Sequence, residues 1–85
     1  MAPYRVLITR EVLALAKPGW RERQRLMNFL ETLADDPFQE GDFQEKDDDG
    51  RTVEVKILGQ YAVTFWADHA LKEVKVTKMV KADME

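Results

Sequence analysis

Two neighbouring segments in the last third of the chain have β-branched or aromatic residues at every second position. Residues 52–58, TVEVKIL, and residues 61–66, YAVTFW, place a β-branched, aromatic or aliphatic side chain at every second position. A period of two in such residues is typical of half-buried antiparallel strands. The short connection Gly59-Gln60 suits a tight turn between them. The pattern therefore predicts a β-hairpin at the centre of the protein.

The alternation also predicts which side chains share a face of each strand. A third alternating segment, Leu71 to Lys81, follows the turn Asp68-His69-Ala70. The apolar sets are expected to face the helices, namely Val53, Val55, Ile57, Val63, Phe65, Val74 and Val76. The residues between them are expected to face outward, namely Glu54, Lys56, Ala62, Thr64, Trp66, Lys75, Thr77 and Lys81.

The first half of the chain predicts one strand and two helices. Residues 4–8 alternate, with the even positions as the core face, and Thr9 can cap a short helix that ends before Pro18-Gly19. Residues 20–34 have helical spacing of apolar positions, and Asp36-Pro37 ends that helix because proline cannot continue the hydrogen-bond ladder. The apolar stripe of this second helix is formed by Leu26, Phe29, Leu30 and Leu33.

The middle segment is less regular. Phe43 lies between polar residues, as in a short edge strand, and Asp48-Asp49-Gly50 is a strong turn signal. The order of elements predicts an α+β fold: an N-terminal strand and a helical hairpin packed on a twisted antiparallel sheet of four to five strands.

Length and composition limit the alternatives. The 85 residues, with no cysteine, predict a single domain over residues 1–85 without disulfides or a thiolate metal site. The N-terminus runs directly into the first predicted strand, so we expect no signal peptide. No apolar run approaches the ~20 residues of a membrane span. We therefore expect a cytoplasmic protein with no membrane association.

The net charge of −3 is distributed unevenly. Residues 1–30 contain six basic and two acidic side chains, residues 31–54 two basic and ten acidic, and residues 55–85 five basic and four acidic. Such asymmetry indicates separate electrostatic faces, one of which can meet a polyanion or an acidic partner. Solvated helix faces and one acidic loop explain the same distribution.

The segments GRTVEVKILGQYAVTFWAD and EVKVTKMVKAD resemble the C-terminal half of the RelE/ParE toxin superfamily. Its members usually read glycine, any residue, tyrosine, arginine, valine at the entry of this strand, and Ala62 occupies the arginine position here. The helix ending in Leu33-Ala34-Asp35-Asp36-Pro37 extends the resemblance over nearly the whole chain. The resemblance implies the same β-α-α-β-β-β order of elements.

The resemblance also implies a function as the toxin of a toxin–antitoxin pair. RelE-like members cleave messenger RNA on the ribosome, ParE-like members poison DNA gyrase, and an antitoxin segment wraps around and silences both. The segment Met79 to Asp83 resembles one that often reads glycine, histidine or lysine, arginine; Lys81 is retained and Ala82 replaces the arginine. The sequence ends at Glu85, before the C-terminal tyrosine or histidine of many members.

Cations on the predicted outward face leave a second interpretation open. Lys56, Lys75 and Lys81 are expected around Trp66, where lysines can bind phosphates and an aromatic ring can stack a base at ~1–3 kcal/mol per base. Lys56 and Lys81 are the candidate catalytic residues of such a rearranged site. Lysines that protect a sheet edge are the simpler explanation.

Other candidates are weaker. Arg21 and Arg25 share one face of the second helix and are candidate contacts to an acidic partner. His69 lies in a predicted turn and is expected to be a solvated residue. Asp47-Asp48-Asp49-Gly50 lacks the spacing of a cation loop, so no metal or cofactor is expected.

Three functional hypotheses follow. The first is a RelE/ParE-like toxin that acts by binding a target, with weak or absent RNA cleavage and a cognate antitoxin as partner. The second is a ribosome-dependent messenger-RNA endoribonuclease that uses the rearranged lysine site. The third is a catalytically silent interaction module. The ribosome with its messenger RNA and DNA gyrase are the candidate targets.

Overall fold

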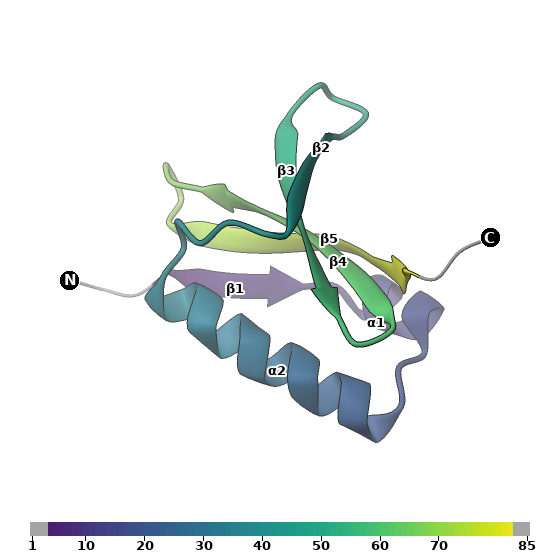
Figure 1. Ribbon diagram of the computed structural model, residues 1–85. Helices are drawn as coiled ribbons and strands as arrows, with labels where there is room; N and C mark the ends of the chain where they lie inside the picture. The colour runs from purple at the N-terminus through teal and green to yellow at the C-terminus, as the bar shows by residue number, and fades with distance from the viewer. Residues whose placement is uncertain (1–3, 83–85) are drawn as a thin grey trace.

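The computed structural model describes residues 4–82, apart from the side chains of residues 15 and 16. The elements occur in the predicted order (Figure 1). They are β1 (Arg5–Ile8), α1 (Arg10–Ala16), α2 (Trp20–Asp35), β2 (Phe43–Lys46), β3 (Thr52–Leu58), β4 (Tyr61–Asp68) and β5 (Glu73–Lys81).

The described strands form one sheet in the order β1-β5-β4-β3-β2. Strands β2 to β5 pair antiparallel through short connections, whereas β1 pairs parallel with β5. The predicted α+β fold is confirmed, and the sheet is mixed because of β1. No hairpin connects β1 to β5, so the local alternation of β1 gives no information about its direction.

Local signals set the helix boundaries. The Thr9 side chain accepts a hydrogen bond from the Val12 backbone amide at 3.2 Å, as expected for an N-cap. Lys17 ends α1 in the left-handed conformation with φ 49°, immediately before Pro18-Gly19. The buried stripe of α2 consists of the four predicted residues, Leu26, Phe29, Leu30 and Leu33.

The main core lies between α2 and the centre of the sheet. The α2 stripe packs with Tyr61, Val63 and Phe65 of β4 and with β5, and the Phe29 and Phe65 rings meet edge to face at 5.5 Å. Val6 and Ile8 of β1 and Val12 and Leu13 of α1 pack around this cluster. The predicted inward direction of Val63, Phe65, Val74 and Val76 is confirmed.

Strand β3 changes partner along its length. Residues 54–58 pair with β4, and residues 52–55 pair with β2, so the start of β3 bends away from β4 together with β2 (Figure 1). We call residues 43–55 the arm. At its tip the Asp47 carboxylate accepts hydrogen bonds from the Asp49 and Arg51 backbone amides, both at 2.9 Å. Figure 1 shows the arm projecting from the sheet on the side away from α2.

We predict that Phe65→Ala lowers the free energy of unfolding by ~3–5 kcal/mol, because Phe65 is 1% exposed and its removal leaves a cavity against Phe29. Leu71→Ala is the control, since Leu71 is 59% exposed in a turn, and we expect a change below about 0.5 kcal/mol. Urea unfolding of both variants measures the difference. Equal effects would show that β4 does not present Phe65 to α2.

We also predict that Gly41→Ala displaces the base of the arm and lowers the unfolding free energy by ~1–3 kcal/mol. A Cβ at Gly41 would lie 2.4 Å from the Val55 carbonyl oxygen, which is backbone and cannot rotate away. In Gly19→Ala the nearest atom is the flexible Glu22 carboxylate, so a smaller loss is expected. Urea unfolding measures both, and a larger loss for Gly19→Ala would contradict the close approach at Gly41.

Candidate functional site

The turn between β3 and β4 decides which side chains of β3 face the helices. Gly59 has φ 61°, and the two-residue connection pairs Leu58 directly with Tyr61. Directly paired residues share a face, so Lys56 lies beside Val63 and Glu54 beside Phe65, on the helix side. The prediction that Val53, Val55 and Ile57 face the helices, with Glu54 and Lys56 outward, is therefore wrong.

A bulge in β5 reverses the faces at the end of that strand. Thr64 pairs with Lys78 and Phe65 with Val76, so Thr77 has no partner on β4. Met79 therefore points into the core, and Lys81 shares the helix-side face with Tyr61. The predicted outward position of Lys81 is wrong, and Lys78 occupies the outward face in its place. The apolar spacing Val74, Val76, Met79 is the signal in the sequence for this bulge.

We call the helix-free surface of the sheet the open face. Cross-strand pairing places Ala62, Thr64 and Trp66 there, as predicted, beside Val80, Lys78 and Lys75 of β5. Trp66 is half-buried, and Thr64 is 5% exposed. Ala62 lies directly opposite Val80, so the end of the open face beside the β3–β4 turn contains two uncharged side chains.

The Trp66 ring has two cations close to it. The Arg51 guanidinium carbon lies 4.0 Å from the ring centroid, and the Lys75 Nζ lies 5.0 Å away. Both distances are within the range of cation–π attraction. Of the three lysines predicted around Trp66, Lys75 is present, whereas Lys56 and Lys81 lie on the opposite face. Arg51 was missed because it precedes the alternating residues of β3.

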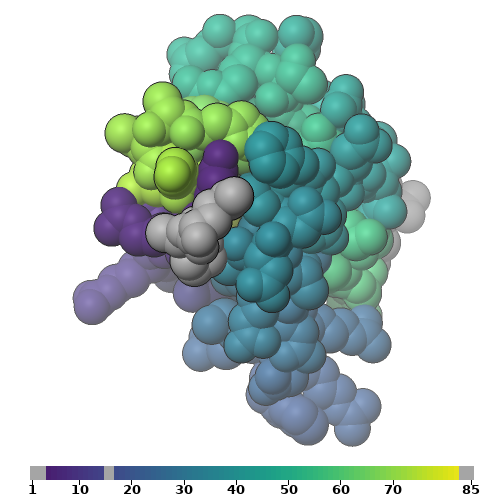
Figure 2. All heavy atoms as spheres, turned by 90° about the vertical axis from the view of Figure 1, so that its left-hand side faces the viewer, coloured from purple at the N-terminus to yellow at the C-terminus, as the bar shows by residue number. Residues whose placement is uncertain are grey.

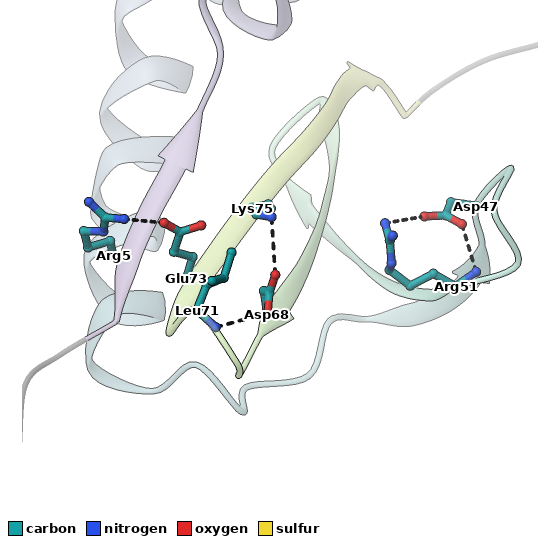
Figure 3. A network of polar contacts seen from close by, with 7 residues as sticks. All are labelled: Arg5, Asp47, Arg51, Asp68, Leu71, Glu73 and Lys75. Atoms are coloured by element: carbon teal, nitrogen blue, oxygen red, sulfur yellow. Dashed lines mark hydrogen bonds and ion pairs between the residues drawn. The ribbon is translucent and has the colours of Figure 1, made fainter.

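Arg51 and two of the three predicted lysines are paired with acids. Lys75 lies 3.4 Å from Asp68, Arg51 lies 3.1 Å from Asp47, and Lys56 lies 3.6 Å from Asp42 (the first two in Figure 3). These exposed pairs contribute little stability, but each carboxylate offsets the charge that a phosphate would need. Among the described residues, Lys78 and Lys81 form no ion pair.

The turn between β4 and β5 fixes the carboxylate that pairs with Lys75. The Leu71 backbone amide donates a hydrogen bond to Asp68 at 3.2 Å, and Lys75 approaches the other carboxylate oxygen (Figure 3). Desolvation raises the pKa of Asp68, but the hydrogen bonds from Leu71 and Lys75 and the charge of Lys75 outweigh it. The pKa of Asp68 therefore lies below its ordinary value.

The two arginines predicted to contact a partner lie on α2. Arg21 and Arg25 are both exposed, and the Arg21 guanidinium lies 5.3 Å from the ring of Trp20, which is 75% exposed. The Arg25 side chain extends toward the turn at Gly59. Their role in partner binding remains a prediction.

An aromatic cluster lies where three distant segments meet. The His69 ring stacks on Phe38 at 4.6 Å, and its Nδ1 lies 2.8 Å from the Tyr4 hydroxyl. Figure 2 shows the purple, blue and yellow-green segments that contain these residues side by side. His69 is exposed, as expected for a turn, but it also joins β1 to the segment after α2. No periodic pattern of residues predicts this cluster.

A groove of about 560 Å³ lies along β5, where α1 approaches the strand. Its lining is mainly apolar and includes Leu7, Val12, Met79 and Val80. Leu7 and Val80 are each 41% exposed.

No helix in the described part of the chain is long and apolar enough to cross a membrane. Within residues 4–82, no group of three or more His, Asp or Glu side chains is placed to hold a metal ion.

Solved structures share this arrangement of helices and sheet. A chain of the archaeal RelE–RelB complex from Pyrococcus horikoshii matches with a TM-score of 0.78 at 21% identity, over 98% of this chain and 99% of that chain. This chain has the RelE-like fold. A chain of the RelBE2 toxin–antitoxin complex from Mycobacterium tuberculosis matches with a TM-score of 0.73 at 19% identity, over 99% and 97%. No family model and no curated protein sequence matches the chain.

We predict that Asp68 titrates below the model-peptide carboxyl value of about 3.9 and that Lys75→Met raises its pKa toward that value. Because the folded-state pKa is lowered, Asp68 stabilises the fold above the unfolded-state pKa, and this contribution is lost as pH falls through the folded-state pKa. NMR titration of the carboxyl carbon measures both pKa values, with Lys72→Met as control. An unchanged Asp68 pKa in Lys75→Met would contradict the pairing.

Proposed function

We propose that this protein is the toxin component of a toxin–antitoxin pair, which acts by binding its target and has weak or no RNA-cleaving activity. The RelE-like fold over nearly the whole chain supports the first part, since both matched structures are named as RelE–RelB or RelBE2 toxin–antitoxin complexes. A cognate antitoxin is the proposed partner. A single domain, a cytoplasmic location and the absence of a cofactor are parts of the same proposal.

The second part rests on one observation: the open face has few cations that are free to bind phosphate. Cleavage through an internal 2′-hydroxyl requires a base, an acid and positive charge around the phosphorane. Ala62 and Val80 lie opposite each other at the end of the face beside the β3–β4 turn, and both cations beside Trp66 are paired with acids. Ala82 adds no charge at the end of β5.

The sheet geometry also weighs against a rearranged lysine site. Lys75 lies on the open face, whereas Lys56 and Lys81 lie on the helix side of β3 and β5. A single phosphate cannot contact lysines on both sides of a sheet. Lys78 is the cation of the open face that has no ion pair among the described residues, and it can contribute to binding without supplying a catalytic acid.

We expect induced expression of this protein to produce little codon-specific cleavage of messenger RNA on translating ribosomes. Loss of one positioned electrostatic stabiliser costs about 10²- to 10³-fold in rate. Ala62 and Ala82 occupy two positions at which the RelE/ParE pattern usually has arginine. Mapping of messenger-RNA ends measures this, with an active RelE-like toxin as positive control. Robust cleavage that Lys78→Ala or Lys75→Ala abolishes would overturn the binding-only proposal.

The toxin assignment is tested by growth and by partner capture. We expect this protein alone to slow growth, and co-expression with the protein encoded by the neighbouring small open reading frame to restore growth and give a complex that co-purifies. Inhibited DNA supercoiling without RNA cleavage would identify gyrase as the target. If this protein causes no growth defect and forms no complex with that partner, the remaining hypothesis is a catalytically silent interaction module.

A further inference from the structure

A hollow lies where β3 diverges from β4 (Figure 1). The pairing of the two strands ends at Glu54 and Phe65, and residues 52 and 53 of β3 pair with β2 instead. The segment after α2, residues 37–40, lines the same hollow. We call this space of about 390 Å³ the notch; its lining includes Phe38, Glu40, Arg51, Glu54, Trp66 and Ala67.

The backbone of Ala67 has no strand partner in the notch. Leu58 and Tyr61 close the two-residue hairpin as a hydrogen-bonded pair, and bonded and non-bonded pairs alternate from there. Along β4 this alternation directs the amide and carbonyl of Phe65, and then those of Ala67, toward the β3 side. The bulge lies in β5, so it leaves the alternation along β4 unchanged. No described residue forms a hydrogen bond with Ala67 on that side.

The amide and carbonyl of Ala67 form a donor and an acceptor that face the same space. The side chain of Ala67 packs against the core, so these polar groups lie at the border of the notch. Backbone groups in such a place take up water or a ligand, because leaving them unpaired costs free energy. The edge of adenine offers the matching pair, an amino donor beside a ring-nitrogen acceptor.

Phe38 supplies ring surface that a planar ligand can cover. Its ring stacks on His69 at 4.6 Å and lies 6.4 Å from the Tyr4 ring, yet Phe38 remains 71% exposed. The other large ring of the notch, Trp66, already has the Arg51 guanidinium 4.0 Å from its centroid. A ligand ring would therefore lie on Phe38, where aromatic stacking adds to the burial of apolar surface.

The charges of the notch favour an uncharged ligand. Glu40 and Glu54 both line it, and the guanidinium of Arg51 already lies 3.1 Å from Asp47. The Glu54 carboxylate is held in place by a hydrogen bond from the Gly41 amide at 2.8 Å. A phosphate group in the notch would be repelled by the two carboxylates, with no unpaired arginine to offset the repulsion.

We propose that the notch binds an uncharged purine, as a free base or a nucleoside. The edge of the base pairs with the amide and carbonyl of Ala67, and its ring lies on Phe38. The volume of about 390 Å³ is at the lower end of the ~300–1,000 Å³ of small-molecule sites. The bound ligand joins β4 to the segment after α2. This inference does not depend on the proposed toxin–antitoxin function.

NMR titration of the full chain with adenosine tests the site directly. The Ala67 amide should shift with saturation and exchange with solvent at least tenfold more slowly, while the Trp66 and Asp68 amides, directed toward β5, should keep their exchange rates. Phe38→Ala should weaken adenosine binding about tenfold. The control is Phe43→Ala, which truncates a 46% exposed ring of β2 outside the notch and should leave binding unchanged.

A second pair of variants tests the backbone contact. Ala67→Pro removes the amide at a position where no strand accepts from it, so proline is tolerated there, and Ala67→Ser keeps the amide. We expect Ala67→Pro to weaken adenosine binding about tenfold and Ala67→Ser to weaken it much less. Thermal unfolding of each variant verifies that it is folded.

Adenosine monophosphate and a short adenylate oligonucleotide distinguish the kinds of ligand. The monophosphate should bind several-fold more weakly than adenosine, and Glu40→Gln should reduce that difference. Tighter binding of the monophosphate would contradict the uncharged ligand. If the oligonucleotide binds through Phe38 and adenosine does not, the notch is an RNA contact and the inference is overturned. An Ala67 amide that is unchanged at millimolar adenosine would overturn it as well.

Discussion

Backbone pairing of β4 with both of its neighbours decides which side chains of this protein meet. On one side the two-residue connection pairs Leu58 with Tyr61, and on the other side the bulge at Thr77 shifts the pairing by one residue. Each of these features moves a whole set of side chains from one face to the other. The core and the open face both follow from them.

The distribution of charge follows from the same pairing. Lys56 is carried to the helix side, where Asp42 neutralises it, and Lys75 remains beside Trp66 but shares its charge with Asp68. The open face is therefore an amphipathic surface with the Trp66 ring toward one end and the aliphatic side chains of Ala62 and Val80 at the other. Such a surface is better suited to contact with a protein or a base than to stabilising a highly charged transition state.

The sequence was sufficient for the elements and for most of the core. Helical spacing identified the four buried residues of α2, and alternation identified Val63 and Phe65 correctly. Alternation alone cannot say which face of β3 is buried, because Val53 and Val55 are also buried, on the open-face side and outside the main cluster. The two-residue turn contained that information, since it pairs Leu58 with Tyr61.

Local sequence patterns could not predict two other features. The Lys56–Asp42 pair and the Tyr4–His69–Phe38 cluster join segments that are adjacent only after the arm and β1 have reached their positions. Lys78 could have been placed from the sequence, because Val74, Val76 and Met79 break the period of two. The site prediction therefore failed mainly because the β3–β4 turn and the β5 bulge determine which face each lysine occupies.

The tip of the arm concentrates negative charge. Asp47, Asp48 and Asp49 lie together at its tip, every residue of β2 is exposed, and Arg51 supplies the neighbouring positive charge. Repulsion among exposed charges is screened as ionic strength rises, with a Debye length near 8 Å at about 0.15 M salt. The repulsion at the tip of the arm therefore varies with the salt concentration, whereas the buried apolar contacts that hold β4 and β5 are not screened. Divalent salts and polyamines, which screen carboxylates more strongly than sodium does, act on the same part of the molecule.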